Sequence, residues 1–336
     1  MLFEGLYGQN EIKKILTDMI TADRVGHAFV FCGPEGVGRK SFAKAFAKGI
    51  MCAHRPRGEE EPCGQCVGCT LMKNDTNPDF VVVMEDEGKN SIGVDTIRAL
   101  QEDMAKAPEY GTKKVYVIGV ADKMTADAQN ALLKTLEEPA EYVVLILVSS
   151  NVLMLLETIR SRVVRLDFAR NSDREVLMAM ERSSIDFRAQ GVSESLICGY
   201  ADGIIGRALG IENFDVFKQI SAEVLEVLSL MPQGKVEFVL RFTRLFEQYE
   251  GNKEFAFYAV NSVLRDVMVL ARHGNQSSLQ NAQSRREIER LVGDLGYHRA
   301  ASAVEILNDA WRLLGKNVNY KLMVGSTAIK LQEAMK

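Results

Sequence analysis

The stretch HAFVFCGPEGVGRKSFAKAF, residues 27–46, decides the fold of this chain. It begins with an apolar run typical of a buried strand, continues into a glycine-rich loop and ends in a segment with helical periodicity. In that arrangement the backbone N–H groups of the loop and the N-terminus of the helix point toward a bound phosphate. The stretch therefore predicts a strand, a phosphate-binding loop and a helix.

The loop departs from the usual pattern G-x-x-x-x-G-K-[ST] at the positions that carry the chemistry. Three glycines permit the tight backbone, namely Gly33, Gly36 and Gly38. Arg39 stands where lysine normally reaches the outer phosphates, and Lys40 stands where a hydroxyl normally binds magnesium. Ser41 comes one residue too late for that task unless the loop is rearranged. ATP or ADP stays an open possibility as a ligand, whereas Mg²⁺ is not expected.

Enzymes with such a loop also carry two acids at the end of a later strand, where one binds magnesium and the other polarises water. In KVYVIGVADKMTADAQNALLKTLEEP, residues 114–139, that strand ends at Gly119 and Val120, and the first acid is Asp122. The loop and the strand end are therefore altered together. This combination predicts a pocket that does not hydrolyse ATP.

Short β-rich runs alternate with segments of helical periodicity in the first half of the chain, which predicts an α/β fold with a parallel sheet covered by helices. The five runs are residues 27–32, 79–85, 114–120, 142–149 and 163–168. The rest of the chain reads as helices, first a small group and then long amphipathic runs. At 336 residues the chain is too long for one ordinary core, so several domains are expected.

Four of the six cysteines cluster in one of the crossovers, with the spacing Cys-x10-Cys-x2-Cys-x2-Cys. The predicted metal ligands are Cys52, Cys63, Cys66 and Cys69. Four thiolates at this spacing predict a closed, structural Zn²⁺ site in a module spanning residues 52–70. Four unliganded thiols and a site with His54 in place of Cys52 are the alternatives. An iron–sulfur cluster is disfavoured because the fourth cysteine lies upstream.

The charge and composition indicate a soluble globular protein. Apolar residues make up 47% and charged residues 26%, and 41 basic residues face 45 acidic ones for a net charge of −4. This balance argues against a protein that coats nucleic acid over its whole surface. The apolar runs are too short for a membrane span, and we expect a cytoplasmic protein.

Four segments resemble the clamp-loader branch of the AAA+ ATPases, which serves bacterial DNA polymerase III. They are residues 5–11 (GLYGQNE), 27–41 (HAFVFCGPEGVGRKS), 121–139 (ADKMTADAQNALLKTLEEP) and 157–162 (ETIRSR). The four-cysteine insertion fits the bacterial type. The resemblance implies an AAA+ domain with a five-stranded sheet over residues 1–168, a helical lid over 169–213 and a helical collar over 214–336.

The resemblance also assigns roles to single residues. Ser161 and Arg162 match the family's Ser-Arg-Cys motif, and Val163 replaces the cysteine. Arg162 then corresponds to the arginine finger that reaches the ATP site of an adjacent subunit. Arg207 corresponds to the second sensor of the lid. The alternatives are that Arg162 pairs with a local carboxylate and that Arg207 is a solvated helix residue.

Together these features predict a non-hydrolysing stator subunit that completes a neighbour's ATP site and helps load the sliding clamp onto primed DNA. The partners implied are ATPase subunits of the gamma or tau type, a delta subunit, the sliding clamp and primer-template DNA. Two rival hypotheses are an active ATPase of the same fold and a non-catalytic, zinc-dependent DNA-binding protein. The first predicts turnover by the isolated chain, and the second predicts tight duplex binding by it.

Overall fold

The computed structural model describes residues 2–55, 58–59, 61–234, 236–274, 279–314 and 318–335. Its contacts divide the chain into two units, Met1–Arg182 with Gly203–Gly206, and Ser183–Asp202 with Arg207–Lys336. The boundaries expected after residues 168 and 213 stay predictions. Each unit is described by itself below.

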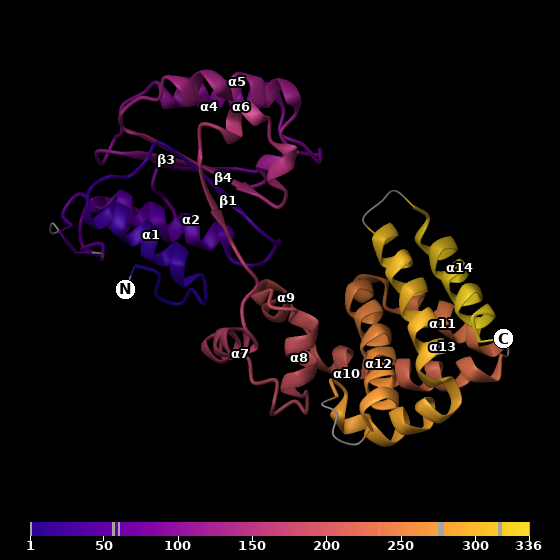
Figure 1. The fold of residues 1–336 in the computed structure, drawn as a ribbon. Helices are drawn as coiled ribbons and strands as arrows, with labels where there is room; N and C mark the ends of the chain where they lie inside the picture. The colour runs from indigo at the N-terminus through magenta and orange to yellow at the C-terminus, as the bar shows by residue number, and fades with distance from the viewer. Residues whose placement is uncertain are drawn as a thin grey trace. The chain divides into compact units, whose positions relative to one another are not determined.

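The first unit is a parallel sheet with helices on both faces (Figure 1), which confirms the predicted α/β fold. The strand order is β2-β3-β4-β1-β5, and every pairing is parallel. The strands are β1 (Ala28–Cys32), β2 (Phe80–Val83), β3 (Lys114–Ile118), β4 (Val143–Ser149) and β5 (Val164–Asp167). Each lies within one of the five apolar runs of the sequence.

The helices of this unit cover the sheet in two layers (Figure 1), with α1 and α2 on one face and α4, α5 and α6 on the other. Their bounds are α1 (Asn10–Thr21), α2 (Arg39–Ile50), α3 (Val67–Lys73), α4 (Val94–Met104), α5 (Ala126–Glu137), α6 (Glu157–Arg160) and α7 (Asp173–Arg182). The helix α9 (Ile205–Leu209) begins in the first unit and ends in the second.

Two apolar cores result from the alternation of side chains along the strands. In β1, Phe29 and Phe31 belong to the core with Phe46 of α2, and the rings of Phe29 and Phe46 meet edge to face at 5.4 Å. Val30, between those two phenylalanines, belongs to the opposite core with Leu132 of α5. Because both faces are covered, the strands are apolar at nearly every position, as the sequence indicated.

The parallel strands end at one edge of the sheet, and this edge positions the candidate site. The phosphate loop follows β1, Gly119 follows β3, and Ser150 follows β4. Since β1, β4 and β3 are neighbours in the sheet, segments more than a hundred residues apart in the sequence meet there. A ligand site outside the carboxyl ends of the strands is the usual arrangement in open α/β sheets.

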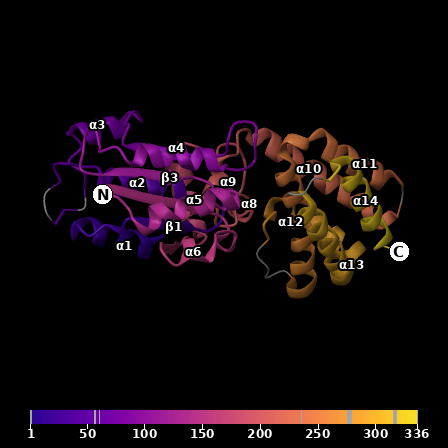
Figure 2. The same cartoon turned by 90° about the horizontal axis from the view of Figure 1, so that it is seen from above.

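The second unit is helical, as predicted, and is seen from another side in Figure 2. Its helices are α8 (Glu194–Ala201), α10 (Phe214–Leu230), α11 (Val236–Gln248), α12 (Lys253–His273), α13 (Arg285–Leu314) and α14 (Tyr320–Glu333). Tyr200 of α8 packs edge to face against Phe217 of α10 and Phe255 of α12, which ties these three helices together. Across the described residues of both units, none of the helices combines the length and the apolar character that crossing a membrane requires.

Candidate functional site

The loop after β1 adopts a backbone that depends on glycine. The φ angles of Gly36 and Gly38 are 81° and 108°, in the region that side chains rarely enter. At Gly33, where φ is 153°, a Cβ atom would lie 2.5 Å from the carbonyl oxygen of Phe168. The N–H of Gly206 donates to the carbonyl oxygen of Gly36 at 2.9 Å and fixes the loop from the other side. The predicted phosphate-loop conformation is therefore built into this edge of the sheet.

A cavity of about 440 Å³ opens beside the loop. Five of the six loop residues predicted as ligands line it, and Gly33 does not. The lining residues are Glu35, Gly36, Gly38, Arg39, Lys40, Ser41, Met84, Glu85, Gly119, Val120, Asp122, Lys123, Val148, Ser150 and Gly206. The sequence interpretation missed Met84, Glu85, Lys123 and Gly206, because their proximity depends on the sheet order.

Arg39 is buried at the start of α2, with 8% of its surface exposed. Its Nη1 atom has no hydrogen-bond partner within the described part of the chain. Burial lowers the pKa of Arg39, and the negative charges of Asp122 and Glu35 oppose that shift. An arginine stays protonated in any such setting. The cavity therefore contains a buried cation with an unused donor.

Lys40 extends toward the end of β3, where the family of phosphate-loop enzymes carries an acid. Its Nζ atom lies 3.7 Å from the sulfur of Met84. A Cβ atom at Gly119 would lie 3.5 Å from Cε of Lys40 and 2.5 Å from the Met84 sulfur. The Met84 sulfur therefore occupies the space of a side chain at Gly119, and the Lys40 methylene is in van der Waals contact with that position.

Two of the three acids that line the cavity, Asp122 and Glu85, form hydrogen bonds with other side chains. Asp122 accepts hydrogen bonds from both the N–H and the hydroxyl of Ser150. Glu85 accepts from Nζ of Lys123 at 2.6 Å, and this contact lowers the pKa of Glu85 and raises that of Lys123. These contacts stabilise the rim of the cavity. Lys123 is paired with an acid, whereas no ion pair within the described residues involves Arg39 or Lys40.

Arg162 lies on the opposite layer of the same unit, just after α6. Its Nη2 atom donates to Oε1 of Glu137 at 2.8 Å, while Nη1 donates to the carbonyl oxygen of Thr158 and to Oγ of Ser161. The Arg162 side chain is 37% exposed and that of Glu137 is 52% exposed. The guanidinium therefore pairs with a local carboxylate, one of the two alternatives, and it does so at the surface. Its role toward a neighbouring subunit stays a prediction.

The segment leading to α6 is held by a buried amide that the sequence interpretation missed. Nε2 of Gln129 on α5 donates to the carbonyl oxygens of Met124 and Met154, and its Oε1 accepts from the N–H of Leu156. Gln129 is 5% exposed, whereas Met154 and the neighbouring Leu153 are 58% and 73% exposed. The hydrogen bonds of Gln129 thus fix the segment that exposes Leu153 and Met154. The same segment leads through α6 to Arg162.

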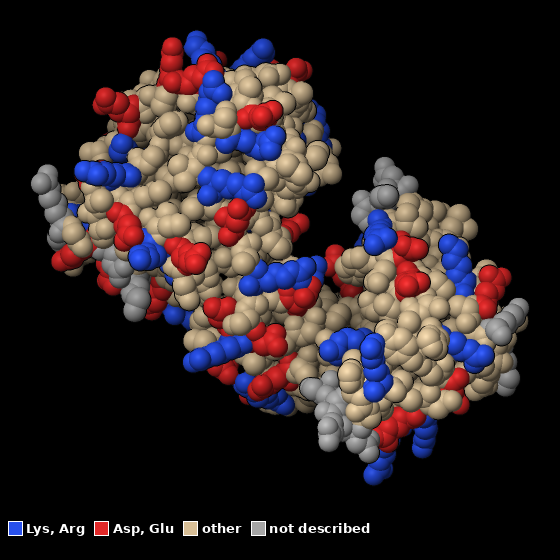
Figure 3. Space-filling view, in the orientation of Figure 1, with Lys and Arg blue, Asp and Glu red and all other residues tan. Residues whose placement is uncertain are grey.

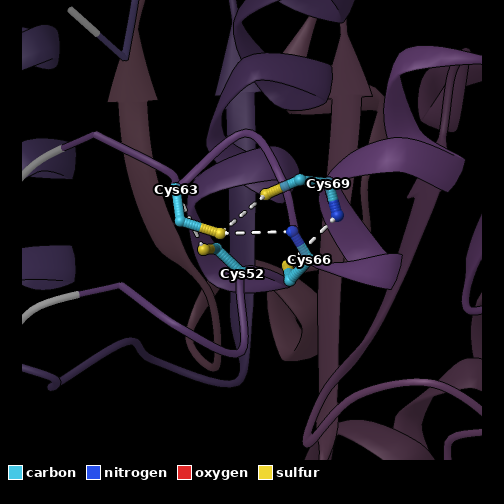
Figure 4. Close-up of side chains that lie close together, drawn as sticks. All are labelled: Cys52, Cys63, Cys66 and Cys69. Atoms are coloured by element: carbon cyan, nitrogen blue, oxygen red, sulfur yellow. Dashed lines mark hydrogen bonds between the residues drawn. The ribbon is translucent and has the colours of Figure 1, made fainter.

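The four predicted metal ligands lie together (Figure 4), with all their sulfur atoms within 4.8 Å of one another. Sulfur atoms of a tetrahedral site with Zn–S bonds of 2.3 Å are about 3.8 Å apart, and the sulfurs of Cys63 and Cys69 are 4.0 Å apart. N–H groups of Gln65 and Cys66 lower the pKa of Cys63 to about 6. The donor set therefore fits a structural metal, although residues 56, 57 and 60 of the predicted module lie outside the described residues.

Arg207 belongs to the second unit and is half-buried on α9. Burial and the charge of Glu254 raise the pKa of Tyr200 above its usual value. The charge of Arg207 opposes this shift. The expected sensor role of Arg207 toward a nucleotide stays a prediction.

A five-stranded parallel sheet in this order with a glycine loop after β1, in a chain whose second unit is helical, defines an AAA+ P-loop protein. Residues 8–172 match the family model described as "DNA polymerase III, delta subunit". The chain is 27% identical over 328 residues to DNA polymerase III subunit delta' of Bacillus subtilis, covering 97% of this chain and 96% of that protein. We conclude that the chain belongs to the delta-prime branch of the DNA polymerase III clamp-loader family.

Other relatives cover less of the chain or resemble it less. DNA polymerase III subunit tau of Bacillus subtilis is 35% identical over 227 residues, which is 67% of this chain and 39% of that protein. The solved structure of a DNA polymerase III gamma subunit-related protein of Thermotoga maritima is 19% identical, with a TM-score of 0.44. That match covers 96% of this chain and 99% of the other.

Proposed function

We propose that this chain is a non-hydrolysing stator of a DNA polymerase III clamp loader, and that it lends Arg162 to the ATP site of a neighbouring subunit. The observation that carries the proposal is a contrast within one unit. The chain's own cavity has Lys40 and Met84 where a magnesium-binding acid belongs, while Arg162 stands exposed on a braced surface. In such a loader, ATP is hydrolysed in the neighbouring subunit, and this subunit completes the neighbour's ATP site with Arg162.

The ion pair with Glu137 is compatible with this role. Pairs between exposed side chains contribute about 0–1 kcal/mol, which is far less than a guanidinium gains from the charge that develops on a transferred phosphoryl group. Removing an arginine finger costs about 10³-fold or more in rate in related GTPases. Arg162 therefore exchanges Glu137 for a phosphate when a nucleotide-loaded partner docks. The exposed Leu153 and Met154 beside it supply apolar surface for that contact.

The partners proposed are the remaining loader subunits of the gamma or tau and delta types, the sliding clamp, and primer-template DNA bound through the assembly. A lone DNA-binding role has less support. Basic and acidic side chains of the described residues are interspersed on the face shown in Figure 3. A duplex-binding surface requires a concentration of positive charge.

The test is a loader reconstituted with Arg162→Ala. ATP turnover should fall by about 10³-fold at the one ATP site that Arg162 completes. Total turnover of the loader then falls by the fraction that this site contributes. The matched control is Arg165→Ala, which removes another exposed arginine three residues away, paired with Asp167 on β5. Turnover that stays the same in the Arg162 variant, or falls equally in both, contradicts the proposal.

A second candidate, a hydrolysing subunit of the same family, is favoured by the 35% identity to subunit tau. It requires Arg39 or Lys40 to rescue the loop. Incubation of the isolated chain with magnesium ATP separates the two functions. Sustained turnover by this chain alone supports the hydrolysing subunit, and its absence supports the stator.

A further inference from the structure

The short helix α6 carries a second arginine, Arg160, two residues before Arg162. Arg160 is partly buried, and its Nε atom is buried without a hydrogen-bond partner. Among the described residues, its guanidinium makes no hydrogen bond and no ion pair. A donor that is removed from water and left unpaired costs free energy, and buried polar atoms of proteins nearly always have an acceptor. Arg160 lacks the acceptor that its position requires.

The backbone that carries Arg160 is held in place. The N–H of Arg160 donates to the carbonyl oxygen of Leu156 at 3.0 Å, and the N–H of Leu156 donates to Oε1 of the buried Gln129 at 2.8 Å. Ile159, the residue before Arg160, has none of its surface exposed. A side chain on such a turn has already lost part of its freedom, so little further entropy is lost when a partner binds it.

The acids near Arg160 do not pair with it. Glu157 lies three residues earlier on the same helix, at a spacing common for ion pairs. No ion pair joins these two side chains within the described part of the chain. Glu137, the other acid of this surface, binds Arg162 at 2.8 Å. The acceptor for Arg160 is therefore expected on another molecule.

The surroundings of Arg160 favour a protein as that molecule. Leu153 and Met154 are 73% and 58% exposed shortly before α6, and apolar surface beside an arginine is typical of protein interfaces. A nucleic acid requires a concentration of positive charge, whereas the acids Glu137 and Glu157 lie on the same surface.

Arg160 and Arg162 do not serve the same acceptor. The turn of α6 continues past its last residue, because the N–H of Arg162 donates to the carbonyl oxygen of Ile159 at 2.9 Å. Two positions along a helix correspond to about 200° around its axis, so the two guanidinium groups point to different sides. If Arg162 reaches the phosphates of a neighbour, Arg160 faces another part of that neighbour.

We propose that Arg160 binds an acidic side chain of the neighbouring loader subunit and holds this chain in the position from which Arg162 reaches the neighbour's ATP. A carboxylate fits, because its two oxygens match Nε–H and one terminal N–H of a guanidinium. Because the neighbour is the one defined by the proposed function, this assignment rests on that function. Arg160 is a positioning residue, and Arg162 is the group that meets the phosphate.

The test is the affinity of the full chain for a purified gamma- or tau-type subunit, measured by fluorescence anisotropy with ATP and without nucleotide. The deciding variant is Arg160→Met, which keeps much of the side-chain length and removes the charge. Affinity should fall by at least about tenfold, and equally in both conditions, because the contact is with the protein. Arg98→Met is the matched control, since Arg98 of α4 is an exposed arginine paired with Asp95.

Further measurements separate this role from a structural one. Because an unpaired buried donor does not stabilise the fold, Arg160→Met should melt at or above the temperature of the parent chain. In the reconstituted loader, a higher concentration of this chain should recover the turnover lost in Arg160→Met and should not recover that lost in Arg162→Ala. Arg160→Lys keeps the charge without the planar fork and should regain only part of the affinity.

The proposal is overturned if Arg160→Met binds like the parent chain, if Arg98→Met loses as much affinity, or if Arg160→Met melts well below the parent. A loss confined to the ATP-bound partner, or one seen only with primer-template DNA, also overturns it and assigns the guanidinium to a phosphate. With any of these results, loss of turnover in Arg162→Ala still supports the stator function. Failure of the parent chain to bind the subunit would contradict that function and this assignment together.

Discussion

The cavity at the ends of β1 and β3 and the surface around Arg162 belong to the same unit, and the proposed function assigns them different halves of one reaction. In the cavity, Lys40 and Gly119 replace the hydroxyl and the acid that hold magnesium. At the surface, Arg162 remains on a segment fixed by Gln129. The two sites depend on different elements, α2 and β3 in one case and α5 and α6 in the other. Because the two sites are built from different elements, the proposed function requires no conflict between losing hydrolysis in the cavity and supplying Arg162 to a neighbour.

Loss of the metal should have the largest effect. It should destabilise the region of α2, which carries the cavity, and leave the region of Arg162 unchanged. The cysteine module follows α2 directly, and a Cβ at Gly68 would lie 2.6 Å from the carbonyl oxygen of Met51 at the end of that helix. We expect Cys66→Ser to lose the proposed Zn²⁺ and about 4 kcal/mol of unfolding free energy, in the range typical of lost metal sites. Hydrogen exchange should increase in α2 and α3 and remain unchanged in α5 and α6.

Metal content and denaturant unfolding of the same preparations measure this effect. Cys198→Ser is the matched control, because Cys198 is a buried cysteine of the second unit and lies outside the cluster. If the parent chain is purified without zinc and is as stable as a zinc-loaded sample, the four thiols are unliganded and the module has no structural metal.

Gln129→Ala should have the next largest effect and should act on the arginine surface alone. The change leaves the N–H of Leu156 and the carbonyl oxygen of Met154 without their partner. Unsatisfied groups cost about 1–3 kcal/mol each when fully buried. These two groups are only partly buried, so we expect a smaller loss of unfolding free energy, and loader turnover falls because Arg162 is no longer positioned. Gln101→Ala is the control, since Gln101 of α4 donates to Ala131 and Thr135 and not to this segment.

The outcome to compare is turnover at matched folded concentration. A loss of stability in both glutamine variants with unchanged turnover assigns Gln129 a purely structural role. A selective loss of turnover in Gln129→Ala, with ADP binding by the chain itself unaltered, shows that the two regions are independent.

Much of this architecture could be predicted from the sequence, because its signals are local. Each strand coincides with a short apolar run, and the cysteine spacing brings its own ligands together within one segment. The glycines of the loop have the positive φ angles that their pattern requires. In each case the residues that interact are near in sequence, so a periodicity or a spacing is sufficient.

The contacts that define the two sites could not be predicted in that way, because they depend on which strands and helices become neighbours. Lys40 meets Met84 and Gly119 only because β1, β4, β3 and β2 are neighbours in that order. Arg162 meets Glu137 across 25 positions through the contact of α5 with α6. Glu137 lies within a segment that carried the family resemblance, and its charge made it one of many possible partners of Arg162. Nothing in the sequence indicated that these two side chains would be in contact.

Restoring the missing acids should have a smaller effect and tests whether the cavity has one defect or several. In Gly119→Asp with Val120→Glu, the new aspartate collides with the Met84 sulfur, at a cost of about 1–2 kcal/mol for the strained packing. We expect the isolated chain to show no turnover of magnesium ATP, because Lys40 still replaces the hydroxyl.

The quadruple variant, which adds Arg39→Lys and Lys40→Thr, is the informative comparison for this prediction. It restores both the lysine and the hydroxyl of the usual loop, and magnesium should then strengthen ADP binding. Efficient hydrolysis by the double variant alone would show that the loop is functional as it stands, and the contrast between the cavity and the arginine surface would disappear.

Glu137→Gln should have the smallest effect and the most specific one. It removes the charge that holds Arg162 in the isolated subunit while keeping the size of the side chain. Because exposed ion pairs contribute about 0–1 kcal/mol, stability should be nearly unchanged, and the apparent affinity for the neighbouring subunit should rise by less than about fivefold. Glu138→Gln, at the next position, is the control for the change in net charge. A lower turnover in the Glu137 variant would mean that this carboxylate orients Arg162 toward the neighbour and does not compete with the phosphate.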